Sequence, residues 1–331
     1  MKKENSSSLG RFVKNLVKRN KSDKLGTVSE IVAVGLDALP RLAAVTRLFI
    51  IHQDDGACHD VPLIRQLLRD VWKIFGDRLQ SLQVQVVFEN LELLLPTHLH
   101  LPNLVMLSVK AEGFSSIKAG VCEAVIPTMI RSHASSLRAV AFTTGNAAVD
   151  TQPIFQSLQV LPRLLAIYLS IPFGPFVPKP FPATRMLYGC RRRLQLLSLD
   201  FGTFMGEHAW RSSTLFSEDW CSVDLPCLRE LRINPPIMDS SQGFIDYIHR
   251  FAPSLITLWI KPNLVFRYDG LGSLCRDFLS LRNLSISIDY FSPDVLALLA
   301  RRLPRLQALN LRYNYLTATT RNHRPLSLVV S

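Results

Sequence analysis

The chain has 331 residues, of which 48% are hydrophobic and 19% are charged, and its formal net charge is +12. So much apolar material excludes an intrinsically disordered chain. No apolar run approaches the roughly 20 residues that a membrane-spanning helix needs, and the N-terminal segment has neither the apolar core nor the cleavage site of a secretory signal. We therefore expect a folded intracellular protein, in the cytoplasm, the nucleus or both. The six cysteines lack the paired spacing of a disulfide framework or a zinc module, so we expect free thiols.

Residues 1–26 carry half of the net charge, with eight basic and two acidic side chains. Helical spacing places Leu9, Phe12 and Leu16 on one face of this segment, with basic side chains on the other. Such a segment fits a flexible tail, a helix that caps the first structural repeat, or a helix that binds an anionic membrane surface or a partner. A short basic import signal is a further interpretation, and the sequence leaves all of these open.

From residue 45 onward, the string Leu-x-x-Leu-x-Leu returns at intervals of roughly 25 to 34 residues, with Val, Ile or Phe as substitutes. The copies begin at Val45, Leu79, Leu104, Leu137, Leu164, Leu194, Leu228, Leu255, Leu281 and Leu306. The second half of each string predicts a short strand whose alternate side chains point to opposite faces. In the eighth copy, for example, Leu258 and Ile260 point inward, while Trp259 and Lys261 point outward.

Segments with helical spacing lie between these strands. The clearest are VPLIRQLLRDVWKIF (61–75), VCEAVIPTMIRSHA (121–134), GFIDYIHRF (243–251) and SPDVLALLARRL (292–303). Ser292 or Asp294 is suited to cap the last helix, and Pro293 to occupy its first turn. The alternation predicts an α/β leucine-rich-repeat solenoid, a horseshoe with parallel strands on the concave side and helices on the convex side. A doubly wound domain is the alternative, disfavoured by about ten copies in phase.

Two copies carry the longer pattern Leu-x-x-Leu-x-Leu-x-x-Asn-x-Leu. These are Leu306, Leu309, Leu311, Asn314 and Leu316, and less closely Leu255, Leu258, Ile260, Asn263 and Val265. Over about residues 40–318 the chain resembles leucine-rich-repeat proteins of the ribonuclease-inhibitor-like kind, most of all the repeat region of fungal F-box proteins. We expect a tail at 1–26, a solenoid of about ten irregular repeats at 27–318 and a second tail at 319–331.

The resemblance implies the substrate-recognition part of a ubiquitin-ligase receptor, with a Skp-type adaptor and a cullin as further partners. The Leu-Pro-x-Glu-like start of an F-box is not recognisable in the roughly forty residues before the first predicted strand. The alternative is a stand-alone leucine-rich-repeat scaffold without a ligase link, associated with a membrane through its basic N-terminal helix.

The outward strand residues of a curved solenoid form a concave surface, where a protein ligand usually binds. We predict the partner-binding residues to be Tyr168, Asp200, Arg232, Asn234, Trp259, Lys261, Asn310 and Arg312. Tyr, Trp and Arg dominate binding hot spots because they combine a large buriable area with a directed polar group. The competing interpretation is that Trp259 packs on its neighbours and the arginines are simply solvated.

No motif supports an enzyme, a cofactor or a metal. The GxGxxG, GxxxxGK[ST], GxSxG and HExxH patterns do not occur. HQDDGACHD (52–60) is the densest cluster of metal-ligand types, but it fits a polar turn before a helix better, and His98 with His100 lacks a third ligand. The basic runs 191–193 and 301–302 are more typical of a solvated edge than of specific nucleic-acid binding. IPFGPFVPKPFP (171–182) predicts an insertion loop, with a polyproline ligand for an SH3-type partner as the alternative.

Overall fold

The computed structural model describes residues 45–51, 61–113, 116–146, 148–171, 183–201, 215–216, 218–235, 242–261 and 264–316. The chain divides into two compact units, the first made of residues 1–44 and 58–75, the second of residues 45–57 and 76–331. The predicted tails at 1–26 and 319–331, the segment 52–60 and the loop residues 172–182 lie outside the described residues.

The described part of the first unit is one helix, α3 (Val61–Phe75), which has the bounds that the sequence predicted. Its apolar residues recur at helical spacing, and Gln66 donates a hydrogen bond to Asp70 at 3.0 Å one turn later. Such a pair, four residues apart on one face, stabilises a helix by about 0.2–0.5 kcal/mol.

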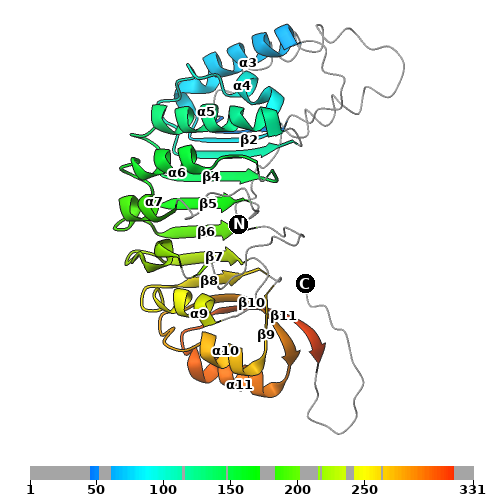
Figure 1. The fold of residues 1–331 in the computed structure, drawn as a ribbon, viewed down its shortest axis with the longest axis vertical. Coiled ribbons are helices and arrows are strands. Elements are labelled where there is room, and N and C mark those ends of the chain that lie inside the picture. The colour runs from blue at the N-terminus through cyan, green and yellow to red at the C-terminus, as the bar shows by residue number, and fades with distance from the viewer. Residues whose placement is uncertain are drawn as a thin grey trace, which may run out of the picture. The chain divides into compact units, whose positions relative to one another are not determined.

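The second unit is built on one parallel sheet, in which the strands stand side by side in the order β1-β2-β3-β4-β5-β6-β7-β8-β10-β11, with β9 paired to β10 (Figure 1). The strands are β1 (Arg47–Ile51), β2 (Ser81–Val87), β3 (Met106–Glu112), β4 (Ala139–Thr144), β5 (Ala166–Ser170), β6 (Leu196–Asp200), β7 (Glu230–Asn234), β8 (Thr257–Ile260), β9 (Val265–Phe266), β10 (Asn283–Phe291) and β11 (Ala308–Leu316). Every predicted repeat string contributes one strand, so the leucine-rich-repeat prediction is confirmed. The two-residue β9 was not predicted.

Along β2, β4, β5 and β6, buried side chains alternate strictly with half-buried ones, whereas the terminal strand β11 has no buried side chain. The register aligns the buried positions of neighbouring strands, so that Leu82 pairs with Leu107, and Leu231 with Leu258. Each repeat therefore adds one rung to a continuous apolar ladder. A one-residue slip of any strand would turn its leucines to the opposite face, so this burial fixes the register.

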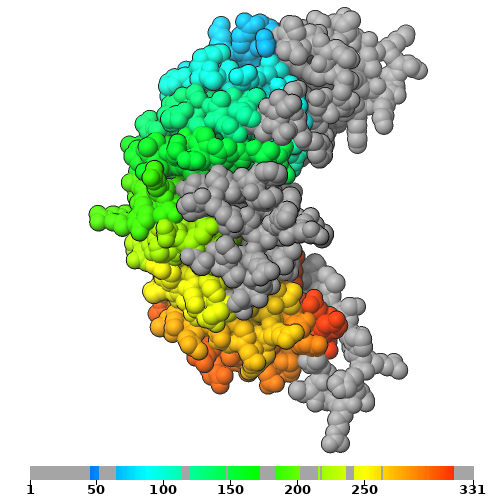
Figure 2. All heavy atoms as spheres, viewed as in Figure 1, coloured from blue at the N-terminus to red at the C-terminus, as the bar shows by residue number. Residues whose placement is uncertain are grey.

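Helices follow most strands and lie along one side of the sheet (Figure 1). They are α4 (Leu91–Leu94), α5 (Ser116–Ser132), α6 (Gln152–Gln159), α7 (Ala183–Cys190), α9 (Gln242–His249), α10 (Tyr268–Leu274) and α11 (Pro293–Arg302), with short 3-10 turns η2 (Gly76–Arg78), η3 (Phe88–Asn90) and η4 (Asp219–Ser222). Ser292 is the N-cap of α11 and Pro293 begins the helix, as predicted, although the Ser292 side chain makes no capping hydrogen bond. In the space-filling view the repeats from green to orange are packed against one another without a break (Figure 2).

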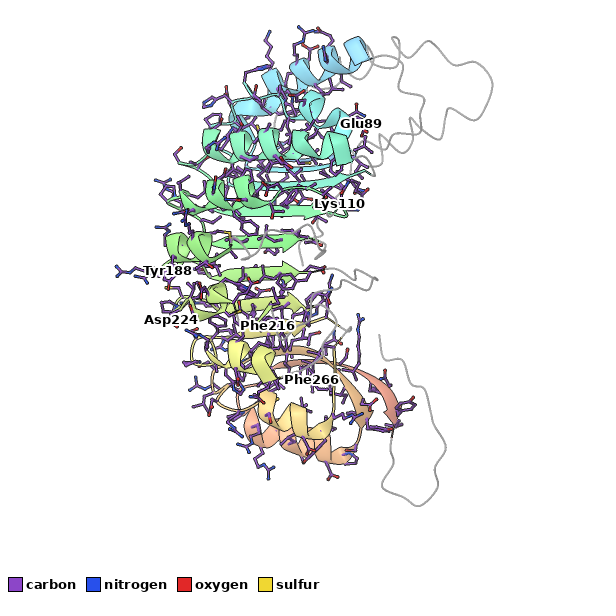
Figure 3. The ribbon with its side chains drawn as sticks, in the orientation of Figure 1. Glu89, Lys110, Tyr188, Phe216, Asp224 and Phe266 are labelled. Atoms are coloured by element: carbon purple, nitrogen blue, oxygen red, sulfur yellow. The ribbon has the colours of Figure 1, made fainter. Side chains whose placement is uncertain are left out.

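An aromatic cluster in the core packs η4 against α9. Trp220 is fully buried, and its ring centroid lies 5.1 Å from that of Tyr247 and 6.0 Å from that of Phe216. Phe216 also meets Phe244 edge-on at 5.1 Å (Figure 3 labels Phe216). Such aromatic pairs add about 0.5–1.5 kcal/mol each beyond their area burial.

Candidate functional site

The outward side chains of the sheet form rows that cross the strands, because neighbouring strands are parallel and in register. The first outward row consists of Tyr168, Ser198, Arg232, Trp259, Ser285 and Asn310. The second outward row consists of Ser170, Asp200, Asn234 and Lys261, then Val265 of β9, Ser287 and Arg312. We call the two rows together the outward strand face.

The structure brings six of the eight predicted residues together on the adjacent strands β5 to β8. In the first row Arg232 pairs directly with Trp259, and only Ser198 separates Arg232 from Tyr168. The other two, Asn310 and Arg312, lie on β11, beyond β10, which contributes two serines to the rows. The predicted set is therefore one group of six and a separate pair.

Asp200, Asn234 and Lys261 form a polar cluster at the C-terminal ends of β6, β7 and β8. Asn234 donates a hydrogen bond from Nδ2 to Asp200 Oδ1 at 2.7 Å, and Lys261 Nζ forms an ion pair with Asp200 Oδ2. The backbone N–H of Lys261 bonds to Ile233 O at 2.9 Å, which holds Lys261 in line with the row. The cluster is partly shielded from water, since the side chains of Lys261 and Asp200 are 34% and 19% exposed.

Asn234 departs from the expectation of an accessible outward residue. It sits in the outward row as predicted, but it is only 4% exposed, and its Oδ1 atom has no hydrogen-bond partner among the residues that the structure describes. Because Asn234 is buried between Asp200 and Lys261, its side chain packs between these neighbours and is not accessible to a binding partner. Ser287, in the same row on β10, is also 4% exposed, and its Oγ has no hydrogen-bond partner in the described part of the chain.

Tyr168 and Arg232 lie within electrostatic reach of each other. Burial raises the pKa of the Tyr168 phenol, the positive charge of Arg232 opposes this shift, and the negative charge of Glu230 reinforces it. Arg232 Nε also donates to Glu230 Oε1 at 2.6 Å, two positions earlier in β7. The guanidinium is thus fixed at Nε, while the side chain remains 45% exposed for further hydrogen bonds.

Glu230 is a residue of this face that the sequence prediction missed. It occupies the position two residues before Arg232, so the period-2 alternation of a strand already places it outward. The string LRELRI already carried this signal, because Glu230 and Arg232 are two positions apart and so share a face. Together the outward strand face offers aromatic area, paired charges and amide groups, which suit apolar contact and hydrogen bonding to a partner.

The remaining titratable groups with shifted pKa values are dispersed in the core. Burial raises the pKa of the Cys122 and Cys275 thiols to about 12 and that of Cys190 to about 11. All five described cysteines are free. Among the described residues no group of three or more His, Cys, Asp and Glu side chains could hold a metal ion. His98 and His100 are both exposed.

His133, which no sequence pattern singled out, is a structural histidine. It is 2% exposed, its Nδ1 donates to Met129 O at 2.8 Å, and its Nε2 accepts from the backbone N–H of Leu101 at 2.9 Å. Both ring nitrogens are satisfied in the neutral form, so the ring ties the end of α5 to the turn before β3.

Within the described ranges, no helix is both long and apolar enough to cross a membrane. The N-terminal segment, the 52–60 cluster and the Pro/Phe-rich residues 172–182 lie outside those ranges, so their predicted roles stay predictions.

No family model matches the sequence, and no curated protein matches it. Solved structures that are similar include a chain in the yeast Rad7–Elc1 complex, which is 13% identical with a TM-score of 0.43, and the match covers 93% of this chain and 69% of that one. Another is a Bacteroides fragilis protein, 14% identical with a TM-score of 0.37, covering 91% of this chain and 81% of that one. Both TM-scores are below 0.5, so neither likeness identifies a function. The leucine-rich-repeat architecture is established by the strand order, register and burial of the chain itself.

Proposed function

We propose that the chain is a protein-binding leucine-rich-repeat module that holds a partner on its outward strand face, as the substrate-recognition part of an F-box-type ubiquitin-ligase receptor inside the cell. The observation that carries the binding role is the first outward row, in which Tyr168, Arg232 and Trp259 gather on β5 to β8. The ligase role rests on the sequence resemblance.

The row is suited to binding because its anchors are held in place before a partner arrives. Arg232 is fixed by Glu230, and Trp259 is half-buried beside it. A side chain that is already ordered loses less conformational entropy on binding, typically saving about 0.5–1.5 kcal/mol per side chain. The neighbouring Asp200–Lys261 pair balances its own charge, so the face fits a mixed polar and apolar protein surface rather than a polyanion.

The test is a paired comparison of two double variants in affinity purification from the protein's own cells. Arg232→Ala with Trp259→Ala removes the centre of the first outward row. Arg185→Ala with Tyr188→Ala is the matched control, since it removes an arginine and an aromatic residue that are exposed on α7. We expect partners to be depleted by the first variant and retained by the second. Equal retention by both variants would place the interface elsewhere.

Binding of the purified chain to a Skp-type adaptor tests the ligase role separately. Saturable binding, with cullin in the eluate from cells, would support a receptor. An adaptor that does not bind, together with a retained single partner, would leave the scaffold alternative. Liposome flotation with and without residues 1–26 then decides whether that scaffold associates with membranes.

A further inference from the structure

We propose a second binding site, a cationic groove at the edge of the sheet where β7, β8 and β10 begin, which takes an acidic peptide segment of a partner protein. The groove has a volume of about 440 Å³ and is lined by Arg229, Arg282 and Arg305, with Cys227, Ile256 and Ser280 among the residues between them. It lies at the turns that precede the strands, away from the C-terminal strand ends where Asp200 and Lys261 meet, and its role is independent of the function proposed above.

The repeat itself places two of these arginines. Arg229 and Arg282 occupy the second position of their repeat strings, directly after the buried Leu228 and Leu281. Backbone hydrogen bonds of 2.8 Å join Ile256 N–H to Arg229 O and Arg282 N–H to Ile256 O. The two arginines therefore stand two strand intervals apart, which separates their backbones by about 10 Å. Ile256 lies between them.

The three arginines have no partner within the described part of the chain. Each side chain is exposed, none takes part in an ion pair or side-chain hydrogen bond there, and no acidic residue lines the groove. Arg250 on the same edge differs, since its Nη2 pairs with Asp224 Oδ1 at 2.9 Å (Figure 3 labels Asp224 near the beginnings of the strands). Cations gathered in a hollow raise the local concentration of anions. When an anion binds, the repulsion between the cations is reduced.

The groove continues along the sheet edge into a second hollow of about 310 Å³, which shares Arg282 and Arg305 and adds Pro304 and Gln307. The volume of the main groove is within the range of about 300–1,000 Å³ seen for ligand sites. Guanidinium groups bind carboxylate and phosphate oxygens through paired N–H donors. An extended acidic segment, charged through Asp, Glu or phosphoserine, therefore fits both the shape and the charge.

The lining favours a peptide over a nucleic acid. Pro226 and Ile256 supply apolar contact, and none of the described residues that line either hollow is aromatic. Sites for single-stranded nucleic acid usually stack bases on aromatic side chains along their cationic track. The chain's segments 1–26 and 317–331 are themselves basic, with the latter holding no Asp or Glu, so neither is a suitable occupant. The occupant is then a segment of another protein.

The test measures fluorescence anisotropy of a labelled peptide of about twelve residues with alternating glutamates, titrated with the full chain. We expect saturable binding that weakens with added salt and is absent for the matching glutamine peptide. Arg282→Glu should weaken it by about tenfold or more, since charge-assisted hydrogen bonds are lost and a repulsion is added. Arg301→Glu, an exposed residue of α11 outside the groove, changes the net charge equally and should alter the affinity by less than about twofold.

Cys227 gives a second readout, because this half-buried free cysteine lines the groove. The glutamate peptide should slow its alkylation, measured by mass spectrometry of the Cys227 peptide. A phosphoserine peptide run in parallel shows which anion the site prefers, and binding of either supports the site. Any of three results would overturn the proposal. These are equal losses of peptide affinity in the two variants, unchanged alkylation of Cys227, and tighter Arg282-dependent binding of an oligonucleotide of equal charge. Circular dichroism confirms that Arg282→Glu is folded.

Discussion

Asp200 and Lys261 are 61 residues apart in the sequence, yet their side chains form an ion pair beside Asn234 of the intervening strand. The pair joins the ends of β6 and β8 across β7, so it forms only when these three strands are in their observed register. The charges of Asp200 and Lys261 also balance each other within the second outward row. Its partly buried position distinguishes it from the exposed pair Lys110–Glu112 on β3 (Figure 3 labels Lys110).

Lys261→Met should lower the free energy of unfolding by about 1–2 kcal/mol, because Asp200 then keeps its charge without its cation in a partly shielded site. Lys110→Met is the matched control, and should cost less than about 0.5 kcal/mol because both partners are half exposed. Urea denaturation of both variants measures the difference. Equal losses would show that the Asp200 cluster adds no more than a surface ion pair.

Acid should destabilise the protein through His133. Burial lowers the pKa of this ring, the bond to Met129 opposes the shift, and the charge of His100 adds to the lowering. The folded-state pKa is therefore below the ordinary value of about 6.5. The stability that His133 contributes is complete above pH 6.5 or so, and is lost as the pH falls through the folded-state pKa.

Urea midpoints of the wild type and of His133→Gln, taken at about pH 7.5 and about pH 5.5, test this linkage. The variant should show a smaller difference between the two pH values. His98→Gln, at an exposed position, should keep the wild-type difference. An unchanged difference in His133→Gln would assign the acid sensitivity to other groups.

Two glycine substitutions in helices should have opposite effects. A Cβ at Gly189 of α7 would lie 2.7 Å from the backbone O of Gln159, so Gly189→Ala must push α7 away from the end of α6. We expect a loss of about 1–3 kcal/mol. Gly120 of α5 is exposed with nothing within 4 Å of such a Cβ, so Gly120→Ala should stabilise by about 0.5–1 kcal/mol. Thermal denaturation of both variants distinguishes close packing from helix propensity.

Tyr247→Phe should leave stability unchanged or raise it by up to about 1 kcal/mol, because the Tyr247 hydroxyl is buried and none of the described residues forms a hydrogen bond with it. The ring itself is needed, since it contacts Phe216, Trp220 and Phe251. Tyr247→Ala should therefore cost about 3–5 kcal/mol. A clear loss in Tyr247→Phe, measured by urea denaturation, would reveal a hydrogen bond to that hydroxyl.

The repeat strings predicted the strands because each copy needs a leucine at every inward position, and that requirement is local. Leu258 and Ile260 could be assigned inward from two residues of context. The same alternation placed Trp259 and Arg232 on one face, but it could not show that they are direct neighbours, because that depends on the register between β7 and β8. It also failed for the accessibility of Asn234, which the flanking strands decide.

The cationic groove, too, was predictable from the sequence only in part. The sequence carries an Arg at the second position of three strings, at Arg138, Arg229 and Arg282, and this recurrence was a usable signal. It could not reveal that Arg305 joins two of them around Ile256 while Arg250 is occupied by Asp224. Those relationships cross repeats whose turns differ in length.

The sequence by itself determined the repeat, the parallel strands and the face to which each strand residue points, because the periodicity of apolar residues sets all three within a few positions. Only the tertiary structure decided which outward residues touch, which are covered and which arginines stay unpaired. Those outcomes depend on contacts between residues 25 to 61 positions apart, such as Asn314 with Asp289 and Lys261 with Asp200. Such contacts form only after the buried leucines have fixed the register of the strands.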